Sequence, residues 1–508
     1  MPALSIALNR FGLGARPDAP MPTDAKSWLT AQLDGFEVRP ASIAALPPRR
    51  EIAEQLARFL EQVRQQQLQN RVAGAAAAAP PRPVDQMNDS AQGTPAAPLG
   101  LAGRQRQQGR AVTDEPGDAG KTLRRNRRLI YADAVGARTL VAVQSATPFV
   151  ERMVHFWANH FAVSVDKPLV LGLTGNMEFE AIRPHVLGKF SDMLNAVERH
   201  PAMLLYLDQA QSVGPNSPLG SRVGRNNPQR KVGLNENLAR EILELHTLGV
   251  RTGYSQADVT EFARAMTGWT VAGIARGPGA RFAGAQGQPG DFVFAPPLHE
   301  PGSRSIMGRR YGEGGERQAQ AVLDMLAAHP ATAQHIATKL ARHFAGDAPP
   351  PALVARLKAN FMATGGDLPS LYKTLVDSPE LWGEAPTKFR SPWEWAVGAM
   401  RALNLREVRA MQITGLMNQL GQPVWGPGSP AGYDDLAVTW AGPDAIVRRV
   451  EVAGAFAARV AGRVDARTLA ARLYPAAVSA PTAAALANAE SPDQALALLL
   501  VAPETLRR

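Results

Sequence analysis

The side chains with the clearest chemical potential lie in residues 233–269, where carboxylates, arginines and a histidine fall into two helical patterns. If Asn235 is the N-cap and each residue turns by ~100°, the leucines and isoleucine of the first pattern form one apolar stripe, and Glu241 falls inside it. A carboxylate in an apolar stripe needs a cation, a histidine, a metal or a proton, because burying a lone charge is costly. We therefore look for a site first at Glu241.

Glu244 lies on a neighbouring angle of the same helix, three residues after Glu241. Two such carboxylates repel unless a cation intervenes or one is protonated, and either state suits general acid–base chemistry. Asn237 borders the same edge, and Arg240 points further toward solvent. Two interpretations stay open. Glu241 is either part of a buried structural ion pair beside an ordinary lattice in which Arg240 bridges Glu236 and Glu244, or the centre of a functional site.

Histidines elsewhere could complete such a site. His160 lies on the flank of the apolar seam of a helix predicted over residues 149–163, where it is either a hydrogen-bonded core-edge residue or a catalytic one. His155 falls on another face and is predicted to be at the surface. The two histidines therefore fail the pattern of a zinc protease, which needs two histidines four apart with a glutamate between them. His246 lies on a separate flank of its own helix, as a packing or helix-end residue.

The second helical pattern opens with Ser255 and Asp258 in a capping-box arrangement and ends at Trp269, a core residue or a pocket wall. Arg264 lies opposite its apolar face. His299 follows in a long loop rich in glycine and proline, and loops on rigid scaffolds commonly carry function. We assign possible substrate binding to Asn237, Arg240, Arg264, Trp269, His299 and Asp208, with Glu241, His160 and Glu244 as the catalytic candidates. Glu300, Lys339 and His343 are further candidates.

The elements that must position these residues are almost all helical. A short helix begins near residue 4, and a turn follows at 12–17. Further helices are predicted at 26–33, 49–70, 121–145, 149–163, 177–207, 234–248, 256–268, 315–328, 331–344, 351–363, 368–378 and 391–403. The segment 177–207 is broken near Pro184 and Pro201, and three or four alanine-rich helices follow residue 403. The only strand-like piece in the glycine-rich and proline-rich interval 272–314 is 291–294, paired with 305–307. The sequence predicts an all-α, non-solenoid fold with long loop insertions and at most a minor β-hairpin.

The domain organisation follows from composition. Residues 1–70 supply N-terminal helices of the main domain, and residues 71–120, rich in Ala, Pro, Gln and Gly, form a disordered or low-complexity insertion. The main helical domain, with the candidate site, covers 121–403. Residues 404–508 form a C-terminal helical region packed on it.

Composition excludes several classes of function. The chain has 508 residues, no cysteine and a formal charge of +10, but its basic runs are short and lack interleaved aromatic residues, so no specific nucleic-acid binding is expected. Cysteine metal sites and thiol nucleophiles are excluded, and no metal site is predicted. Phosphate-binding glycine loops and the serine-hydrolase elbow are also missing. We expect no membrane span and, because no export signal is visible, a cytoplasmic protein; a start misplaced in the sequence would make it periplasmic or exported.

Ordered sequence blocks resemble the bacterial domain-of-unknown-function family 1800. They are LNRFGLGARP at 8–17, FWANHF at 156–161, PAMLLYLD at 201–208, NENLAREILELHTLGV at 235–250, Asp258-Val259 with ARAMTGW at 263–269, KLARHF at 339–344 and KFRSPWEW at 388–395. The resemblance implies a mainly helical bacterial protein of unassigned activity. It also implies a neighbour from a second family, numbered 1501, that looks related to sulfatase or phosphatase folds. Many members look exported through a twin-arginine signal, which is missing here. The first block commonly reads W-H-x-H-F, and Ala158 replaces its first histidine.

Two functions from different classes remain. The first is an enzyme, a hydrolase or lyase acting on a carbohydrate-like or polymeric substrate with a buried Glu/His constellation. The second is a non-catalytic binding or assembly partner of a family-1501-like protein, with Arg240, Glu244 and Arg264 in a structural charge network. The sequence names no cofactor. Geometry discriminates between them. Glu241 and His160 within hydrogen-bond reach at the floor of an open cleft that His299 also enters would favour the enzyme, and a Glu241 sealed against Arg240 or Arg264 without a pocket would favour the structural network.

Overall fold

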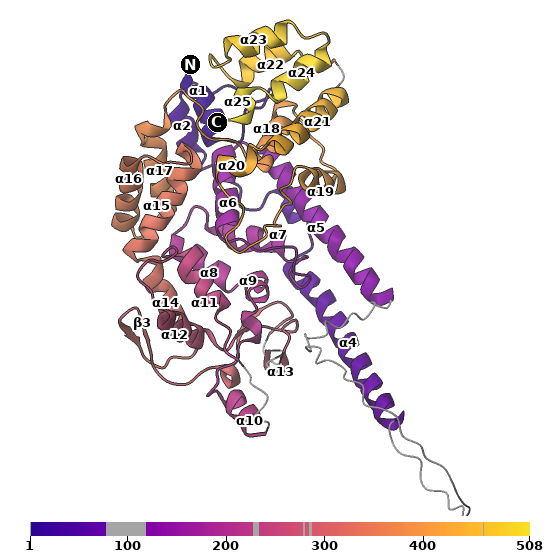
Figure 1. Ribbon diagram of the computed structural model, residues 1–508, viewed down its shortest axis with the longest axis vertical. Helices are drawn as coiled ribbons and strands as arrows, with labels where there is room; N and C mark the ends of the chain where they lie inside the picture. The colour runs from indigo at the N-terminus through magenta and orange to yellow at the C-terminus, as the bar shows by residue number, and fades with distance from the viewer. Residues whose placement is uncertain (1, 78–117, 227–232, 278–279, 284–286, 461) are drawn as a thin grey trace, which may run out of the picture.

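The computed structural model describes residues 2–77, 118–226, 233–277, 280–283, 287–460 and 462–508, and it is built almost wholly of helices (Figure 1). This confirms the predicted fold class. The first half contains α1 (Pro2–Ile6), η1 (Ala7–Phe11), α2 (Ala25–Ala31), α3 (Ala41–Ala44), α4 (Arg49–Ala77), α5 (Asp118–Gln144), α6 (Pro148–His160), α7 (Thr174–Met177), η2 (Glu178–Ile182), η3 (Arg183–His185), α8 (Phe190–Glu198), α9 (Pro201–Tyr206), η4 (Gln209–Gln211), α10 (Pro218–Asn226), α11 (Asn237–Glu241), η5 (Ile242–His246) and α12 (Gln256–Met266).

The second half begins with loops and returns to helices. After α13 (Ala280–Ala283) and η6 (Pro296–Leu298), it contains α14 (Glu316–Ala327), α15 (Pro330–Ala345), α16 (Pro351–Thr364), α17 (Leu368–Asp377), η7 (Pro379–Leu381), α18 (Pro392–Ala402), α19 (Ala410–Gln419), α20 (Ala437–Trp440), α21 (Pro443–Val460), α22 (Ala466–Leu473), α23 (Ala480–Ala487), α24 (Pro492–Leu500) and α25 (Pro503–Leu506). No helix in the described part of the chain is long and apolar enough to cross a membrane.

The predicted strand pairing is wrong. Instead of one hairpin, the described residues hold two small antiparallel sheets, one of β1 (Trp269–Val271) with β2 (Phe292–Phe294), and one of β3 (Arg304–Ile306) with β4 (Arg309–Tyr311). Met307 and Gly308, at φ 51° and 73°, form the two-residue turn between β3 and β4. Such a turn closes its own hairpin, so β2 pairs with the strand that leaves α12.

The predicted caps are confirmed only in part, because α11 begins at Asn237 with Glu236, not the predicted Asn235, as its N-cap. Ser255 and Asp258 form the reciprocal capping box of α12, and Pro148 lies at the first position of α6. Helix α4 continues to Ala77 and α5 starts at Asp118, so both helices extend into the predicted low-complexity insertion at 71–120. The two helices run together as a projecting arm (Figure 1). The rest of the predicted insertion, 78–117, lies outside the described residues.

Two hydrophobic cores organise the molecule. The first is built mainly from α6, α8, α9, α11, α12 and α14–α17, and the second mainly from α5, α18, α19 and α21–α24. The N-terminal segment joins them, since Phe11 belongs to the first core and Leu13 to the second. The division predicted at residue 403 stays a prediction. What matters for function is the boundary between the two cores, where polar side chains gather.

Candidate functional site

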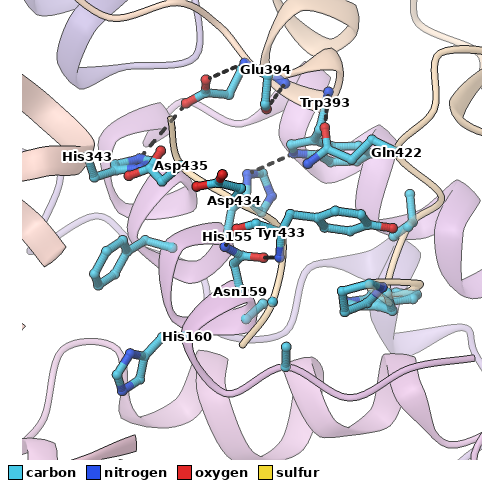
Figure 2. Close-up of a pocket in the computed structure, with 18 of the residues that line it drawn as sticks. His155, Asn159, His160, His343, Trp393, Glu394, Gln422, Tyr433, Asp434 and Asp435 are labelled. Carbon is cyan, nitrogen blue, oxygen red and sulfur yellow. Dashed lines mark hydrogen bonds and ion pairs between the residues drawn. The ribbon is translucent and has the colours of Figure 1, made fainter. Parts of the chain in front are cut away.

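A cavity of about 480 Å³ lies where the two cores meet. Its walls come from α6, α15, the start of α18 and the loop 422–435 (Figure 2). Phe156 and Val163 of the first core face it from one side, and Trp393 and Trp425 of the second core from the other. Three of the sequence blocks that carry the family resemblance, 156–161, 339–344 and 388–395, therefore contribute to one cavity.

His155 lines the cavity from α6, which corrects its predicted place at the surface. The face of α6 opposite the apolar seam is covered by α18 and the loop 422–435. The indole N–H of Trp393 donates to His155 Nδ1 at 3.2 Å. Because an indole N–H only donates, Nδ1 is unprotonated and a neutral ring carries its proton on Nε2. Burial, helped by the nearby Arg138 and Arg152, holds the pKa of His155 well below its usual value, so the ring is a neutral Nε2–H donor.

His160, a predicted catalytic residue, is buried at the end of α6 and also lines the cavity. Its Nε2 lies 3.1 Å from the carbonyl oxygen of His246, which can only accept, so Nε2 carries the proton. Its Nδ1 has no hydrogen-bond partner among the described residues. Burial and then the Lys339 charge keep its pKa well below the ordinary value. His160 is thus a neutral imidazole with an unused acceptor.

Helix α15 brings two unpaired cations to the cavity. Lys339 and Arg342 are three residues apart, so they share one face of the helix. Neither side chain makes a hydrogen bond or ion pair with any described residue, and Arg342 Nε is buried without a partner. Burial lowers the pKa of Lys339 to about 8, although the charge of Asp435 opposes the shift. A significant part of this amine is therefore neutral near pH 7 to 8.

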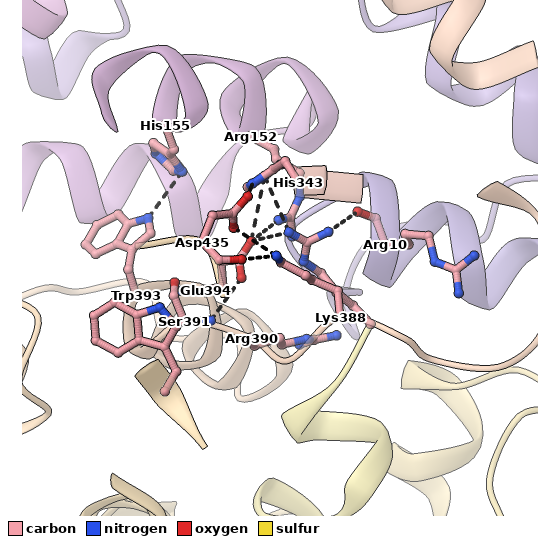
Figure 3. Close-up of polar contacts among 12 residues, drawn as sticks. Arg10, Arg152, His155, His343, Lys388, Arg390, Ser391, Trp393, Glu394 and Asp435 are labelled. Carbon is pink, nitrogen blue, oxygen red and sulfur yellow. Dashed lines mark hydrogen bonds and ion pairs between the residues drawn. The ribbon is translucent and has the colours of Figure 1, made fainter. Parts of the chain in front are cut away.

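The neighbouring wall is a charged network whose members all have partners (Figure 3). Glu394 accepts from Arg152 and, at 2.8 Å, from Arg508. Asp435 lies 3.3 Å from Lys388 Nζ and 3.5 Å from His343 Nδ1. Arg508 also lies 3.4 Å from His343 Nε2, so that nitrogen accepts and the ring proton faces Asp435.

The network holds both of its carboxylates ionised. Burial alone would raise the pKa of Glu394, but the charges of Arg508 and Arg152 bring it well below its usual value. Burial would likewise raise the pKa of Asp435, but the nearby His343, Lys388 and Arg508 bring that pKa below the usual value. Neither carboxyl group carries a proton at neutral pH.

Local sequence explains how this wall is placed. Ser391 and Glu394 form a capping box at the start of α18, with Pro392 at its first position. Glu394 therefore uses one oxygen to accept the Ser391 N–H at 3.0 Å and the other to pair with the arginines. The cap fixes the direction of both Glu394 and Trp393.

The loop 422–435 closes the cavity and is held by Asn159. The Asn159 amide donates to the Tyr433 carbonyl at 2.9 Å and accepts from its N–H at 2.7 Å. Gly432, at φ 81°, makes the close approach possible, because a Cβ there would lie 2.2 Å from the Asn159 carbonyl oxygen. One side chain thus pins the loop to α6.

We predict that Asn159→Ala loosens the loop 422–435 and lowers the free energy of unfolding by about 2 kcal/mol, because two hydrogen bonds at about 1 kcal/mol each are lost. Amide hydrogen exchange should rise in 422–435 and little elsewhere. Asn176→Ala, which removes a contact with Glu180 at the surface, is the matched control. Unchanged exchange in the loop would contradict this account of how the cavity is closed.

The other predicted catalytic residues lie outside the cavity lining. Glu241 is half-buried and makes no hydrogen bond or ion pair with any described residue. Burial, with a contribution from Glu244, raises its pKa. Arg240 lies 3.3 Å from Glu236 and 3.6 Å from Glu244, and Asn237 is exposed. The lattice of the structural interpretation is therefore present, but its buried ion pair is not, because Glu241 is only half-buried and has no cation partner among the described residues.

The predicted binding residues are also dispersed. Trp269 is fully buried in β1 against Phe292, and His299 Nδ1 donates to the Thr267 carbonyl at 2.8 Å. The remaining predicted residues have polar partners of their own, which are Glu261 for Arg264, Lys167 for Asp208 and Asn216 for Glu300. Of the residues first assigned to the site, only His160 lines the cavity, and the further candidates Lys339 and His343 join it.

The segment that follows Glu241, residues 242–246, contacts His160 and His335 and so supports one side of the cavity. The helix changes to a π-helical turn, η5, in which the carbonyls of Leu245 and His246 lie 3.1 Å from Nε2 of His335 and His160. The His246 ring is fully buried and lies 2.7 Å from the Glu198 carboxylate. This buried pair fixes the turn, and the turn fixes the orientation of His160.

Sequence reasoning missed Arg342, Glu394 and Asp435. The cap S-P-W-E at 391–394 was a usable signal for a helix start, but nothing local shows that Glu394 meets Arg152. Among the described residues, no group of three or more histidine, aspartate or glutamate side chains is placed to hold a metal ion. The arrangement offers instead an amine with a lowered pKa, an unpaired arginine and a neutral imidazole donor.

Comparison with known proteins gives one match. The sequence model of a family described as "Protein of unknown function (DUF1800)" matches residues 6–507. No curated protein and no solved structure matches the chain.

Proposed function

Because the chain belongs to DUF1800, a family of unknown function, its reaction has to be inferred from its own geometry, and we propose an enzyme that works in the cavity between α6 and α15. The proposed enzyme is a hydrolase or lyase, and its substrate is carbohydrate-like and acidic. Lys339 acts as the general base, Arg342 binds the negative group of the substrate, and the His155 Nε2–H donates a hydrogen bond.

The unpaired state of Lys339 and Arg342 carries this proposal. The other cations around the cavity have carboxylate partners: Arg138 pairs with Glu178, Arg152 and Arg508 with Glu394, and Lys388 with Asp435. Charges in a partly buried site are costly unless they are paired. Two cations held together without a partner favour an anionic ligand.

Size and lining support a sugar-like ligand. About 480 Å³ falls in the range of small-molecule sites, roughly 300 to 1,000 Å³. Trp393, Trp425 and Tyr433 offer aromatic surface, and His155 and Ser429 offer polar groups. A sugar ring has apolar faces and a polar edge, which suits such a mixed wall.

The second candidate is a non-catalytic binding or assembly partner of a family-1501-like protein. The lattice of Arg240 with Glu236 and Glu244 favours it only in part, since those charges satisfy one another within the chain. The charges of the lattice are neutralised within the chain and need no external partner, whereas Lys339 and Arg342 lack a carboxylate partner that a ligand could supply.

The proposal is tested by screening the wild-type protein against acidic glycans, neutral glycans and phosphoesters, after metal analysis of the purified protein. We expect turnover of an acidic glycan, and we expect Glu241→Gln to retain it because Glu241 lies outside the cavity lining. Failure to bind or convert any acidic glycan would contradict the proposal. Loss of turnover in a folded Glu241→Gln variant would mean that the active site lies at the Glu241 helix and not in the cavity.

A further inference from the structure

We propose that the reaction in the cavity is a β-elimination on a uronic-acid unit, in which Arg342 binds the carboxylate and Lys339 removes the proton from the adjacent carbon. This inference rests on the proposed function and narrows it to a lyase. Three observations carry it: the contacts of the cavity carboxylates, the spacing of Lys339 and Arg342, and the tautomer of His155.

The cavity carboxylates are poorly suited to hydrolysis of a glycosidic bond. Hydrolases of this kind use two carboxyl groups, one protonated as the acid and one free as the base or nucleophile. Glu394 is paired with Arg152 and Arg508, and Asp435 with Lys388 and His343. Both stay ionised, and their oxygens are engaged by cations. Neither can supply a proton to a leaving oxygen. The third carboxylate of the lining, Asp434, is exposed, and its two oxygens accept the Leu436 N–H at 3.1 Å and the Thr439 hydroxyl at 2.7 Å within its own segment.

A β-elimination needs a cation that binds the carboxylate and a base beside it, and α15 supplies both. The proton next to a carboxylate is hard to remove, because the carbanion adds a second negative charge to the same group. A cation on the carboxylate relieves that repulsion, and arginine binds carboxylates through two parallel hydrogen bonds. Arg342 has no partner among the described residues that would have to be displaced. Lys339, one helical turn away on the same face, is then beside the adjacent carbon.

The surroundings of Lys339 keep its amine usable as a base. On its own helix it faces Arg342, His335 and His343, from α6 it faces His160, and from the loop 422–435 it faces Asp435. The histidines His160 and His335 are neutral, since burial lowers the pKa of both. Only Asp435 favours the charged amine, and it is already held by Lys388 and His343.

The bonds balance without an oxidant, a reductant or added water. The C–H bond breaks and its proton moves to the Lys339 amine, while its electron pair forms a C=C bond to the next carbon. The C–O bond on that carbon breaks, and the leaving oxygen takes the proton back from the Lys339 ammonium. The His155 Nε2–H, whose direction is fixed by the Trp393 contact, donates a hydrogen bond to that oxygen.

Product analysis in ¹⁸O-labelled water tests the inference. The wild-type protein is incubated with polygalacturonate and with alginate, and a neutral glucan serves as the control. We expect cleavage of a polyuronate to give a new end with an ultraviolet-absorbing C=C bond conjugated to the carboxylate, and no ¹⁸O. Products that carry ¹⁸O and lack the double bond would overturn the elimination and leave the proposed enzyme standing. Absence of both binding and cleavage with both polyuronates would overturn the elimination on a uronic-acid unit, whereas the proposed enzyme falls only if the other acidic glycans of the screen also fail to bind and react.

A variant at Arg342 tests its separate role. For Arg342→Met we expect kcat/KM for the polyuronate to fall roughly 10- to 100-fold, through a higher KM because the carboxylate loses its binding partner and through a lower kcat because the developing charge is no longer relieved, and Arg342→Lys should recover part of it because the charge returns. Arg317→Met on α14 is the matched control for loss of an arginine outside the cavity lining. If Arg342→Met leaves KM unchanged, Arg342 does not bind the carboxylate and the inference is wrong.

Discussion

Lys339→Met is expected to abolish turnover, by roughly 100- to 10,000-fold in kcat, while leaving the protein folded. Methionine keeps a similar length and removes the only group in the cavity that we assign as base. Because the Lys339 amine makes no hydrogen bond or ion pair with a described residue, no partner loses its hydrogen bond. Steady-state kinetics on the acidic glycan measure the effect, and Lys373→Met at an exposed site is the control.

The same variant is expected to be more stable than wild type at neutral pH, by roughly 3 kcal/mol. The pKa of Lys339 is about 8 in the folded protein, against 10.5 as its ordinary value. Between these values the unfolded chain binds more protons than the native one, so the wild type gains stability as the pH rises. The advantage of Lys339→Met is therefore full below pH 8 and fades as the pH approaches 10.5. A lower melting temperature with undiminished turnover would refute the role of Lys339.

Glu394→Gln is expected to lower the free energy of unfolding by about 3 to 5 kcal/mol, the largest stability loss that we predict. Glutamine keeps the shape of the side chain and can still accept the Ser391 N–H, so the change isolates the charge. Arg152, fully enclosed, and Arg508 would be left without their carboxylate partner. Arg508 also pairs its backbone with Lys388, so the C-terminal end should loosen first.

Urea unfolding of Glu394→Gln measures the loss, and hydrogen exchange at the C-terminal end locates it. Glu244→Gln is the matched control, because its partner Arg240 is at the surface and such pairs contribute at most about 1 kcal/mol. Equal effects of the two substitutions would mean that the buried network around Glu394 does not hold the two cores together.

The sequence predicts most helices because their start signals are local. Pro148, Ser255 and Pro392 each mark a helix start within a residue or two, since the groups that satisfy the first turn are adjacent in sequence. Strand pairing is less local. The strand at 292–294 has a partner at 269–271, and only the tight turn at Met307 and Gly308 explains why the nearer segment is unavailable.

The site is harder to predict, for two physical reasons. The projection that placed Glu241 in the apolar stripe assumes a continuous α-helix, and the π-helical turn from Ile242 to His246 shifts the angle of every later residue. The second reason is distance along the chain. His155 looks like a surface residue on its own helix because its cover, Trp393 with the loop 422–435, belongs to a distant segment. The sequence suggested Lys339 and His343 as candidates, but it could not predict that they line the same cavity as His160.

The central claim, that Lys339 is a titrating amine in a site for acidic sugars, is tested most directly by acylation of its amine as a function of pH. Peptide mass spectrometry follows Lys339 and, as an internal reference, the exposed Lys373. We predict that acylation of Lys339 is half-maximal near pH 8, and that galacturonate slows it in the wild type but not in Arg342→Met. Acylation of Lys339 that parallels that of Lys373 at every pH, with no protection by galacturonate, would contradict the claim.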